Sequence, residues 1–420
     1  MISSSFPAKN ALMVYDSSSG YYRPYTNNDS ISSIDRSPLD EFITASKVFY
    51  INSQSTYGVS KLTEESGVAF GSTIIENSGL LKLETANQTG SNAYLQTIKR
   101  GIAHCASNNE ALLNVNIHSS PTGNQYSRWG YFDGVNGVGY GYDQSGLYVF
   151  KATNSSYEKV YRQNWGLNTL SGDNNNYNGF NPINSIYCYG VNISNDNLEN
   201  FIVVKNSELN KKQRVTVHNW DDASLIDRNQ HLRIEVNNAQ GVGQLGCSIG
   251  NKTYSMLGGE INITRRPMVG YISKYTMTSS ENQWVPVLAV RRKATFGPSN
   301  RTNSVNVRLH GLPVLSDQDS EFMVTIGANV TGTNWVAPDF RSATDTVTEV
   351  QKITNNNLGV SVTGEIIAHE SLFASNKQDS SIGAQELSYF GNGGELVLFA
   401  RKTTANATII SATLHWDEEY

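Results

Sequence analysis

Four aromatic residues near the middle of the chain have the side-chain types of a sugar-binding surface. Trp129, Tyr131, Trp165 and Tyr177 lie among Asn, Asp and Gly residues. Rings that line a groove can stack on the faces of sugar rings, while neighbouring polar groups pair with the hydroxyls. Aromatic residues at alternate strand positions are more often part of the core. These four residues are therefore candidate glycan contacts, with burial in the core as the alternative.

Carboxylates in the same region could take part in glycoside hydrolysis, which needs two Asp or Glu side chains at a set separation. Asp133, Glu199, Asp221 and Asp222 are the candidates. The sequence supplies neither that separation nor the geometry by which a Ser–His–Asp set is recognised. We therefore predict no catalytic residues and a protein that is not an enzyme.

Two further patterns resemble binding motifs. Gly241–Gly246 matches the G-x-G-x-x-G of dinucleotide sites, but the residues after it predict strand and turn rather than the helix that holds a pyrophosphate. Asp173–Gly179 is rich in oxygen ligands, yet it lacks the spacing and the closing Glu of a calcium loop. The seven His residues form no H-x-H or H-E-x-x-H spacing. We expect no cofactor and no metal site.

Composition limits the classes of partner. The chain has 420 residues, of which 16% are charged, and a net charge of −5, and its Lys and Arg residues form only short clusters, so we expect no nucleic-acid partner. No run approaches the roughly 20 apolar residues of a membrane span, and the first residues lack a signal-peptide pattern. The three distant cysteines, Cys105, Cys188 and Cys247, form no disulfide framework. We expect a protein that is made in a cytoplasm and contacts no membrane.

Residues 128–165 show the pattern of an antiparallel β-meander. Apolar and polar residues alternate in Gly146–Lys151, and the dipeptides Asp133-Gly134 and Asn136-Gly137 supply the positive φ angles of tight hairpin turns. Similar short runs with short polar spacers continue through the chain without a long helical period. Such spacing favours antiparallel pairing, because parallel strands need longer crossovers. The sequence therefore predicts an all-β fold of antiparallel sandwich or jelly-roll domains.

The composition and the hydrophobic pattern of the chain change at two places, which we take as domain boundaries. Residues 1–60 begin with a polar, aperiodic stretch that is typical of an extended arm or anchor, although residues 40–51 could open as a short helix. Residues 61–280 form the first predicted β-sandwich. A Ser/Asn-rich spacer then precedes a second predicted sandwich, residues 281–420, which ends in a cleanly alternating strand.

An ordered series of short motifs carries a family resemblance over about residues 93–420. The motifs are QTIKR at 96–100, RWGYFD at 128–133, Asn136-Gly137, QNW at 163–165, LRIEV at 232–236, CSI at 247–249 and WDE at 416–418. Their succession resembles a poorly characterised family of virion structural proteins of tailed phages and large DNA viruses. The chain departs from that family at Ile186–Asn192, where the family has a W-L-G-x-G-x-V-R strand.

The resemblance implies a concanavalin-like β-sandwich in a particle-associated protein, such as a capsid or tail appendage, spike or decoration. It brings no catalytic residues with it. By analogy with other virion proteins, we expect a homotrimer that contacts other virion proteins, assembles through its N-terminal arm and sheet surfaces, and is located in the virion. The leading hypothesis is therefore a non-enzymatic virion structural protein of a bacteriophage. The alternative is a receptor- or glycan-binding module for host attachment to a surface glycan, and a polysaccharide depolymerase ranks third.

Overall fold

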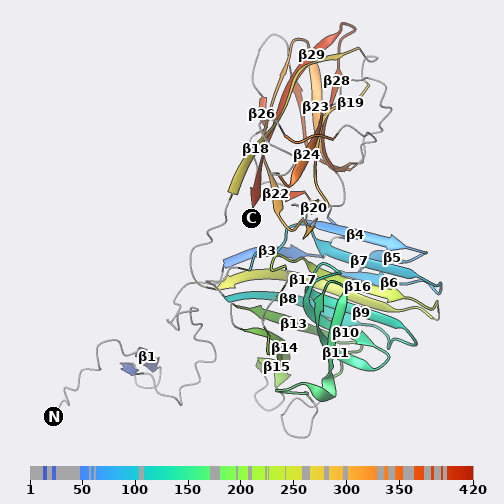
Figure 1. Cartoon of the computed structure of the whole chain (residues 1–420), viewed down its shortest axis with the longest axis vertical. Coiled ribbons are helices and arrows are strands. Elements are labelled where there is room, and N and C mark those ends of the chain that lie inside the picture. The colour runs from blue at the N-terminus through green and yellow to red at the C-terminus, as the bar shows by residue number, and fades with distance from the viewer. Residues whose placement is uncertain are drawn as a thin grey trace, which may run out of the picture.

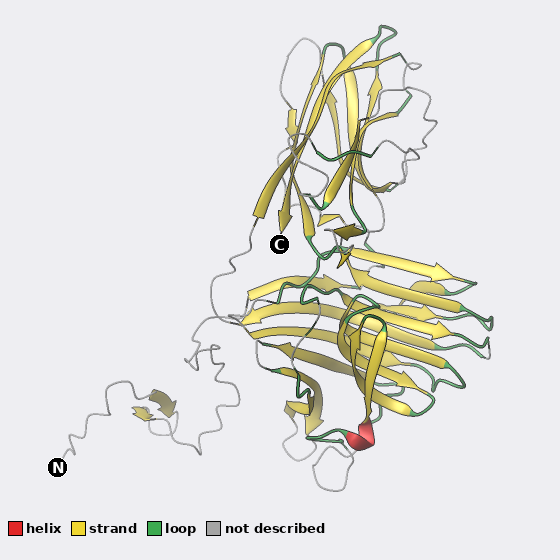
Figure 2. Cartoon of the chain, in the orientation of Figure 1, coloured by secondary structure: helices red, strands yellow, loops and turns green. Residues whose placement is uncertain are grey.

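Strands make up nearly all the regular structure of the described chain. In the computed structural model, the described residues are 13–16, 21–24, 48–55, 58–60, 63–103, 108–170, 180–194, 197–206, 211–222, 225, 227–241, 243–257, 265–278, 283–296, 301–328, 335–338, 346–352, 364–372, 380–382, 389–390 and 395–419. Within these ranges the only helix is the 3-10 turn Arg162–Asn164, and every strand-to-strand ladder is antiparallel (Figure 2). The prediction of an all-β, antiparallel fold is confirmed.

A seven-stranded sheet that contains the predicted meander forms one layer of the first unit. Its strand order is β12-β11-β10-β9-β16-β7-β4 (Figure 1). Tight turns join the four consecutive strands from β9 to β12. In the turn between β11 and β12, Asn154 and Ser155 both have positive φ, as a tight hairpin turn requires. The strands are β4 (Glu64–Ala69), β7 (Ser91–Thr97), β9 (Gln125–Phe132), β10 (Gly137–Asp143), β11 (Gly146–Thr153), β12 (Ser156–Tyr161) and β16 (Leu232–Asn238).

An eight-stranded sheet forms the second layer. Its order is β15-β14-β13-β8-β17-β6-β5, and β3 pairs with the far half of β17. The strands are β3 (Val48–Gln54), β5 (Thr73–Asn77), β6 (Leu80–Glu84), β8 (Asn108–Ile117), β13 (Ile186–Ile193), β14 (Leu198–Asn206), β15 (Lys211–Asn219) and β17 (Gly246–Leu257). The two sheets enclose one apolar core drawn from the inward-facing residues of both.

Large aromatic side chains and a few polar contacts join the two layers. Trp129 on β9 packs edge-on against Tyr189 on β13, with ring centroids 5.0 Å apart. The hydroxyl of Tyr140 on β10 lies 2.7 Å from the carbonyl oxygen of Phe201 on β14, to which it can donate. The side-chain amide of Asn200 donates in the opposite direction, to the carbonyl of Gly139 at 3.1 Å. These contacts satisfy polar groups that would otherwise be stranded in the core.

The second unit is a smaller sandwich of two five-stranded sheets. One has the order β18-β29-β22-β26, with β27 also on β22, and the other has the order β24-β19-β28-β23-β25. Their apolar faces share a core that includes Trp416. The strands are β18 (Arg265–Met277), β19 (Val285–Arg292), β22 (Asn306–Ser316), β23 (Ser320–Ala328), β24 (Thr348–Lys352), β25 (Glu365–Leu372), β26 (Ser380–Ile382), β27 (Tyr389–Phe390), β28 (Glu395–Lys402) and β29 (Thr408–Glu419); β20 (Thr295–Phe296) and β21 (Arg301–Thr302) form a small hairpin.

Strand pairing differs from the predicted segmentation at both ends of the first unit. β3 lies within the predicted arm, yet it pairs with β17 as a strand, which leaves no helix over its part of residues 40–51; residues 40–47 lie outside the described residues. β18 precedes the predicted boundary at 280, yet it pairs along its length with β29. The chain therefore changes sheets between Leu257 and Arg265. The hairpin β1 (Met13–Asp16) and β2 (Tyr21–Pro24) forms a sheet of its own, away from both units (Figure 1).

Close backbone approach in the meander requires glycine at position 139. A Cβ atom there would lie 2.3 Å from the carbonyl oxygen of Trp129 and 3.1 Å from the ring of Phe150. We expect Gly139→Ala to lower the free energy of unfolding by about 1–3 kcal/mol, because an overpacked position forces the neighbouring strands apart. Urea unfolding measures the loss. Gly166→Ala is the matched control, since a Cβ at Gly166 meets nothing within 4 Å, and equal stability of the two variants would contradict the argument.

Candidate functional site

The predicted glycan contacts lie inside the molecule. Trp129 and Tyr131 are 0% exposed and Trp165 is 5% exposed, and all three belong to the core of the first unit. The Trp165 indole donates to the carbonyl of Val160 at 3.1 Å. Tyr177 lies outside the described residues. The prediction of a sugar-stacking surface at Trp129, Tyr131 and Trp165 is therefore corrected: their rings point between the sheets and offer no face to a ligand.

The alternate residues of the same strand point away from the core. Because side chains alternate along a strand, Tyr126 and Arg128 of β9 face outward where Trp129 and Tyr131 face the core. The register sets Glu235 of β16 opposite Arg128, and Tyr94 of β7 opposite Glu235. We call the set Tyr94, Gln96, Tyr126, Arg128, Tyr157, Arg233 and Glu235 the outer face of the seven-stranded sheet. All of these residues except Gln96 are partly exposed, and the side chains of Arg128, Glu235 and Arg233 are 11%, 12% and 13% exposed.

Arg128 is the centre of the outer face. Its guanidinium carbon lies 3.9 Å from the ring centroid of Tyr126 and 3.8 Å from that of Tyr157, so the planar group lies against both rings. Its Nη1 lies 3.5 Å from Oε1 of Glu235. Burial, with Glu235 adding to it, raises the pKa of Tyr157 to about 12. The Tyr157 phenol therefore keeps its proton, which it donates to the carbonyl of Gly134 at 2.7 Å.

Arg233 continues the same surface toward β7. Its Nε donates to Glu235 Oε2 at 2.9 Å, and its Nη1 donates to Gln96 Oε1 at 2.6 Å. The guanidinium carbon lies 4.2 Å from the ring centroid of Tyr94. Gln96 in turn donates to Glu65 at 3.1 Å. The result is a rigid lattice of planar polar groups and tyrosine rings, held on strands rather than on loops.

Glycines beneath this lattice let the aromatic side chains lie flat. Gly130, Gly139 and Gly141 occupy outward positions of β9 and β10, and a Cβ at Gly141 would lie 2.3 Å from the ring of Tyr148. Tyr148 and Phe150 of β11 fill the space over these glycines and are fully buried, with Tyr157 packed against their cluster. In both paired strands these glycines fall on the alternate positions that face away from the core. That pattern is the sequence signal that could have indicated aromatic side chains packed over the outside of the sheet.

The candidate catalytic carboxylates are distributed over different elements, and three of them face cations. Asp133 in the β9–β10 loop lies 3.8 Å from Arg100. Glu199 on β14 binds Arg214, and Asp222 lies 3.2 Å from Lys151. Asp221 is exposed. Within the described residues no group of three His, Cys, Asp or Glu side chains could hold a metal ion.

One Ser–His contact was missed in the sequence. Gly246–Gly250 reads GCSIG and so has the G-x-S-x-G spacing, and Nε2 of His118 lies 2.6 Å from the Ser248 hydroxyl oxygen. Ser248 is 2% exposed and lies within β17, paired with β6 on one side and β8 on the other. In the G-x-S-x-G elbow of α/β-hydrolases the serine instead lies on an exposed strand-to-helix turn, beside N–H groups that bind the oxyanion. The Ser248–His118 pair therefore serves as a structural contact. The G-x-G-x-x-G segment is also structural, since it leads into β17 rather than into a helix.

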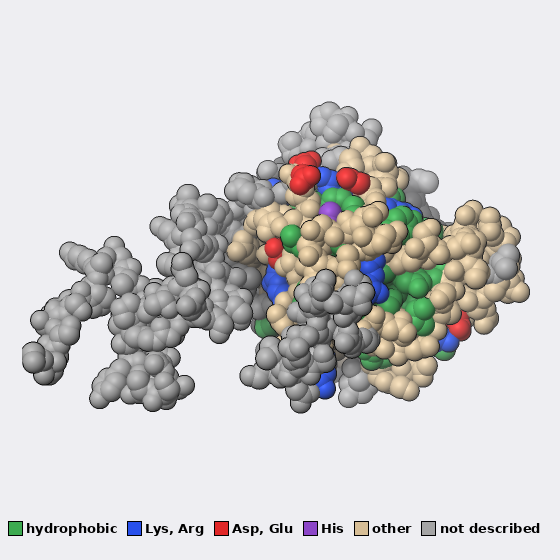
Figure 3. All heavy atoms as spheres, turned by 90° about the horizontal axis from the view of Figure 1, so that it is seen from below, with side chains coloured by type: hydrophobic (Ala, Val, Ile, Leu, Met, Phe, Trp, Pro, Cys, Tyr) green, Lys and Arg blue, Asp and Glu red, His purple; other side chains and the backbone are tan. Residues whose placement is uncertain are grey.

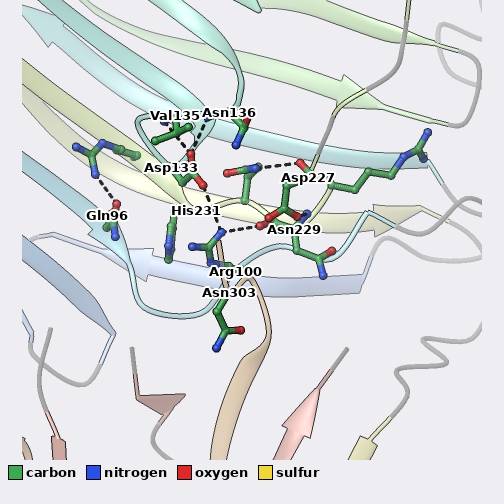
Figure 4. Close-up of polar contacts among 12 residues, drawn as sticks. Gln96, Arg100, Asp133, Val135, Asn136, Asp227, Asn229, His231 and Asn303 are labelled. Atoms are coloured by element: carbon green, nitrogen blue, oxygen red, sulfur yellow. Dashed lines mark hydrogen bonds and ion pairs between the residues drawn. The ribbon is translucent and has the colours of Figure 1, made fainter. Parts of the chain in front are cut away.

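A buried polar cluster joins the first unit to the second. Figure 4 shows its part around Arg100, whose guanidinium donates to the carbonyl of Asn229 at 2.9 Å and lies 3.8 Å from Asp133. The side chain of Asn306 on β22 accepts from the backbone N–H of Arg100 at 2.7 Å and donates to the Arg100 carbonyl at 3.1 Å. Its amide also lies 3.2 Å from the hydroxyl of Tyr50, which donates to Glu419 at 3.1 Å. Burial, with the nearby charge of Arg100, lowers the pKa of Arg292 to about 9. This cluster positions the units and is closed to solvent, so it offers no binding surface.

His231 lies in this cluster as a neutral imidazole. Its Nδ1 lies 2.6 Å from the carbonyl oxygen of Thr97 and donates to it, while its Nε2 is buried without a hydrogen-bond partner. Burial, helped by Arg100 and Arg292, lowers the pKa of His231 well below its ordinary value of 6.5. The side chain is thus uncharged in the folded protein at any pH where unfolded histidine begins to titrate.

Charges on the visible lower face of the molecule are mixed. Figure 3 shows Lys and Arg side chains scattered among Asp and Glu, with apolar patches between them, and no block of one sign. Cys247 forms no disulfide, and burial raises the pKa of its thiol; Cys105 and Asp173–Gly179 lie outside the described residues. In the described part of the chain no helix is long and apolar enough to cross a membrane.

Comparisons with known proteins find solved structures that match part of the chain at low similarity. No protein-family model and no curated protein matches the chain. Among solved structures, peanut lectin with a bound peptide matches at 11% identity and a TM-score of 0.33, covering 50% of this chain and 98% of the lectin. The cellulose induced protein Cip1 matches at 10% identity and a TM-score of 0.32, covering 49% and 96%. A carbohydrate esterase of the Shiga toxin-encoding bacteriophage phi24B matches at 11% identity and a TM-score of 0.30, covering 51% and 100%. Likenesses of this size carry no inference about ligand or activity.

The neutral state of His231 predicts a pH dependence of stability. As the pH falls below 6.5, the unfolded chain takes up a proton that folded His231 does not, so the free energy of unfolding drops by about 1 kcal/mol between pH 6.5 and 5.5. His231→Asn keeps a donor for Thr97 and removes the titration, so its stability should fall less over this range. Urea unfolding at the two pH values measures the difference. An unchanged pH slope in His231→Asn would refute the assignment.

Proposed function

We propose that the protein is a non-enzymatic glycan-binding component, and that the first unit binds a neutral oligosaccharide on the outer face of its seven-stranded sheet. The observation that carries the proposal is the packing of Arg128 against both Tyr126 and Tyr157 beside Glu235. Tyrosine rings offer flat apolar surface for the C–H faces of sugars, and the adjoining guanidinium, carboxylate and amide edges can pair with hydroxyls.

The charge balance of the surface favours an uncharged ligand. Arg128 and Arg233 face Glu235, Lys159 pairs with Asp143 at 2.9 Å, and Glu65 accepts from Gln96. Each cation therefore has a carboxylate beside it. An anionic or cationic ligand would have to displace one of these partners, whereas hydroxyl groups can add to groups that are already oriented.

Binding without catalysis is supported by the state of the carboxylate at the centre of the surface. Glu235 accepts hydrogen bonds from Arg233 and lies against Arg128 on its other oxygen. Two guanidinium groups thus occupy the positions that a water or a glycosidic oxygen would need in hydrolysis. The role of a bacteriophage virion structural component, which the motif order resembles, is compatible with such a binding face and stays a prediction, as do host attachment and the homotrimer.

Substitutions on the outer face test the proposal. Tyr126→Ala and Tyr157→Ala should each weaken binding of the best oligosaccharide from a glycan array by roughly tenfold, about 1.4 kcal/mol, because each removes one ring beside Arg128. Titration calorimetry with that oligosaccharide measures the change.

The matched control is Phe49→Ala, at an aromatic residue 57% exposed on β3 of the other sheet, which should leave the affinity unchanged. An array without any hit, or a hit whose affinity is the same in all three variants, would exclude the outer face as the binding site.

A further inference from the structure

Arg162 is a half-buried cation at one end of the first unit. It begins the 3-10 turn Arg162–Asn164 that follows β12, and Figure 2 shows this turn at the end of the unit that lies away from the second unit. Burial lowers the pKa of Arg162, and the ionisable groups that act on it are the phenols of Tyr189, Tyr142 and Tyr187. No carboxylate among the described residues forms an ion pair with it. A charge that has lost part of its hydration without gaining a counter-ion favours an anionic ligand.

This lack of a counter-ion distinguishes Arg162 from comparable arginines. In the described part of the chain, the other arginines whose guanidinium lies over an aromatic ring each pair with a carboxylate. They are Arg128 and Arg233 with Glu235, Arg214 with Glu110 and Glu199, Arg291 with Glu349, and Arg401 with Glu321. Arg162 lies over Phe180, with its guanidinium carbon 4.9 Å from the ring centroid, and has no such partner among the described residues.

Two backbone carbonyls hold the Arg162 guanidinium in place. Its Nε donates to the carbonyl of Thr169 at 2.7 Å, and its Nη2 donates to the carbonyl of Leu170 at 2.6 Å. These bonds use one side of the planar group. The remaining N–H groups on Nη1 and Nη2 lie along its end, where a carboxylate can accept from both at once. The cation is therefore oriented before a ligand arrives, which lowers the entropy cost of binding.

Aromatic side chains form a wall beside this cation. The ring centroids of Phe180 and Tyr187 lie 4.7 Å apart, and those of Tyr187 and Tyr189 lie 6.4 Å apart. Phe180, Tyr187 and Tyr142 are partly exposed and pack against the core of the first unit. Such rings offer apolar surface to the C–H groups of a sugar, and the phenols add hydrogen-bonding groups for its hydroxyls.

The hydroxyl of Tyr189 is a buried polar group at the same end of the unit. The residue is 1% exposed, and within the described residues its hydroxyl has no hydrogen-bond partner. Burial raises the pKa of Tyr189, so the phenol keeps its proton and can donate it. The ionisable groups that act on this phenol are those of Tyr187, Arg162 and Tyr142, which places the hydroxyl on the side of the cation. Buried polar groups are normally paired, so this donor is a second feature suited to an anionic oxygen.

We propose that this end of the first unit binds a sugar that carries a carboxylate. The carboxylate pairs with the end of the Arg162 guanidinium and accepts from the Tyr189 hydroxyl, and the sugar ring lies against Phe180 and Tyr187. The site shares no residue with the outer face, and it selects a charge where the outer face favours a neutral ligand. Either site can therefore exist without the other.

Calorimetry on the full chain tests the charge preference. The probes are the tightest ligand from an array of oligosaccharides that end in glucuronate, galacturonate or N-acetylneuraminate, and the same glycan with its carboxylate reduced to an alcohol. The acidic form should bind at least about tenfold more tightly. Arg162→Gln should remove this preference. Arg401→Gln is the matched control and should keep it, because Arg401 also lies over an aromatic ring but pairs with Glu321. An array without a hit, or equal binding of the two forms by the wild type, would overturn the proposal.

Tyr189→Phe separates ligand binding from folding, because Arg162 also holds the backbone at Thr169 and Leu170. The variant removes only a hydroxyl that has no partner among the described residues, so thermal unfolding should be unchanged. Its affinity for the acidic probe should fall about fivefold, the effect of one lost hydrogen bond. An unchanged affinity would contradict the site, and so would acetate that competes as well as the acidic glycan does.

Discussion

The missing side chains of Gly130, Gly139 and Gly141 are the constraint on which the first unit depends. Gly130 and Gly139 face each other where β9 and β10 approach too closely for a Cβ atom, and a Cβ at Gly141 would meet the ring of Tyr148. The space above them takes the rings of Tyr148 and Phe150, so the sheet carries a second apolar layer on the side away from the main core. That layer supports Tyr157, and Tyr157 supports Arg128. The outer face is thus held in one arrangement by packing beneath it, and such preorganisation lowers the entropy cost of binding any ligand there.

Polar contacts between described residues join the two units. Asn306 takes the place of a neighbouring strand for the backbone of Arg100, by both donating and accepting. Arg100 and Arg292 are both buried beside this contact, and the buried His231 carries no charge. Buried ionic and polar groups add little net stability, but they are costly to separate, because each would lose its partner. Such a junction favours one relative arrangement of the two units.

Much of the fold could be predicted from the sequence, because alternation and turn dipeptides are local signals. The meander from β9 to β12 follows directly from the alternating runs around Asp133-Gly134 and Asn136-Gly137. What the alternation could not predict was which set of alternate residues on a strand faces the core. Trp129 and Tyr131 alternate as expected, but the pattern does not say which face lies inward, and Tyr126 and Arg128 were on the other parity. The pairing of β18 with β29, about 140 residues away, depends on long-range contacts that no short pattern contains.

The contact between Tyr50 and Glu419 brings the beginning and the end of the folded body together. Tyr50 lies in β3, the first strand of the first unit, and Glu419 ends the last strand of the second. For protein engineering, this proximity means that a short linker could join the two ends and that a new start could be opened in an exposed loop. A circular permutant of this kind would carry the N-terminal hairpin, or any fused domain, at a different site on the surface.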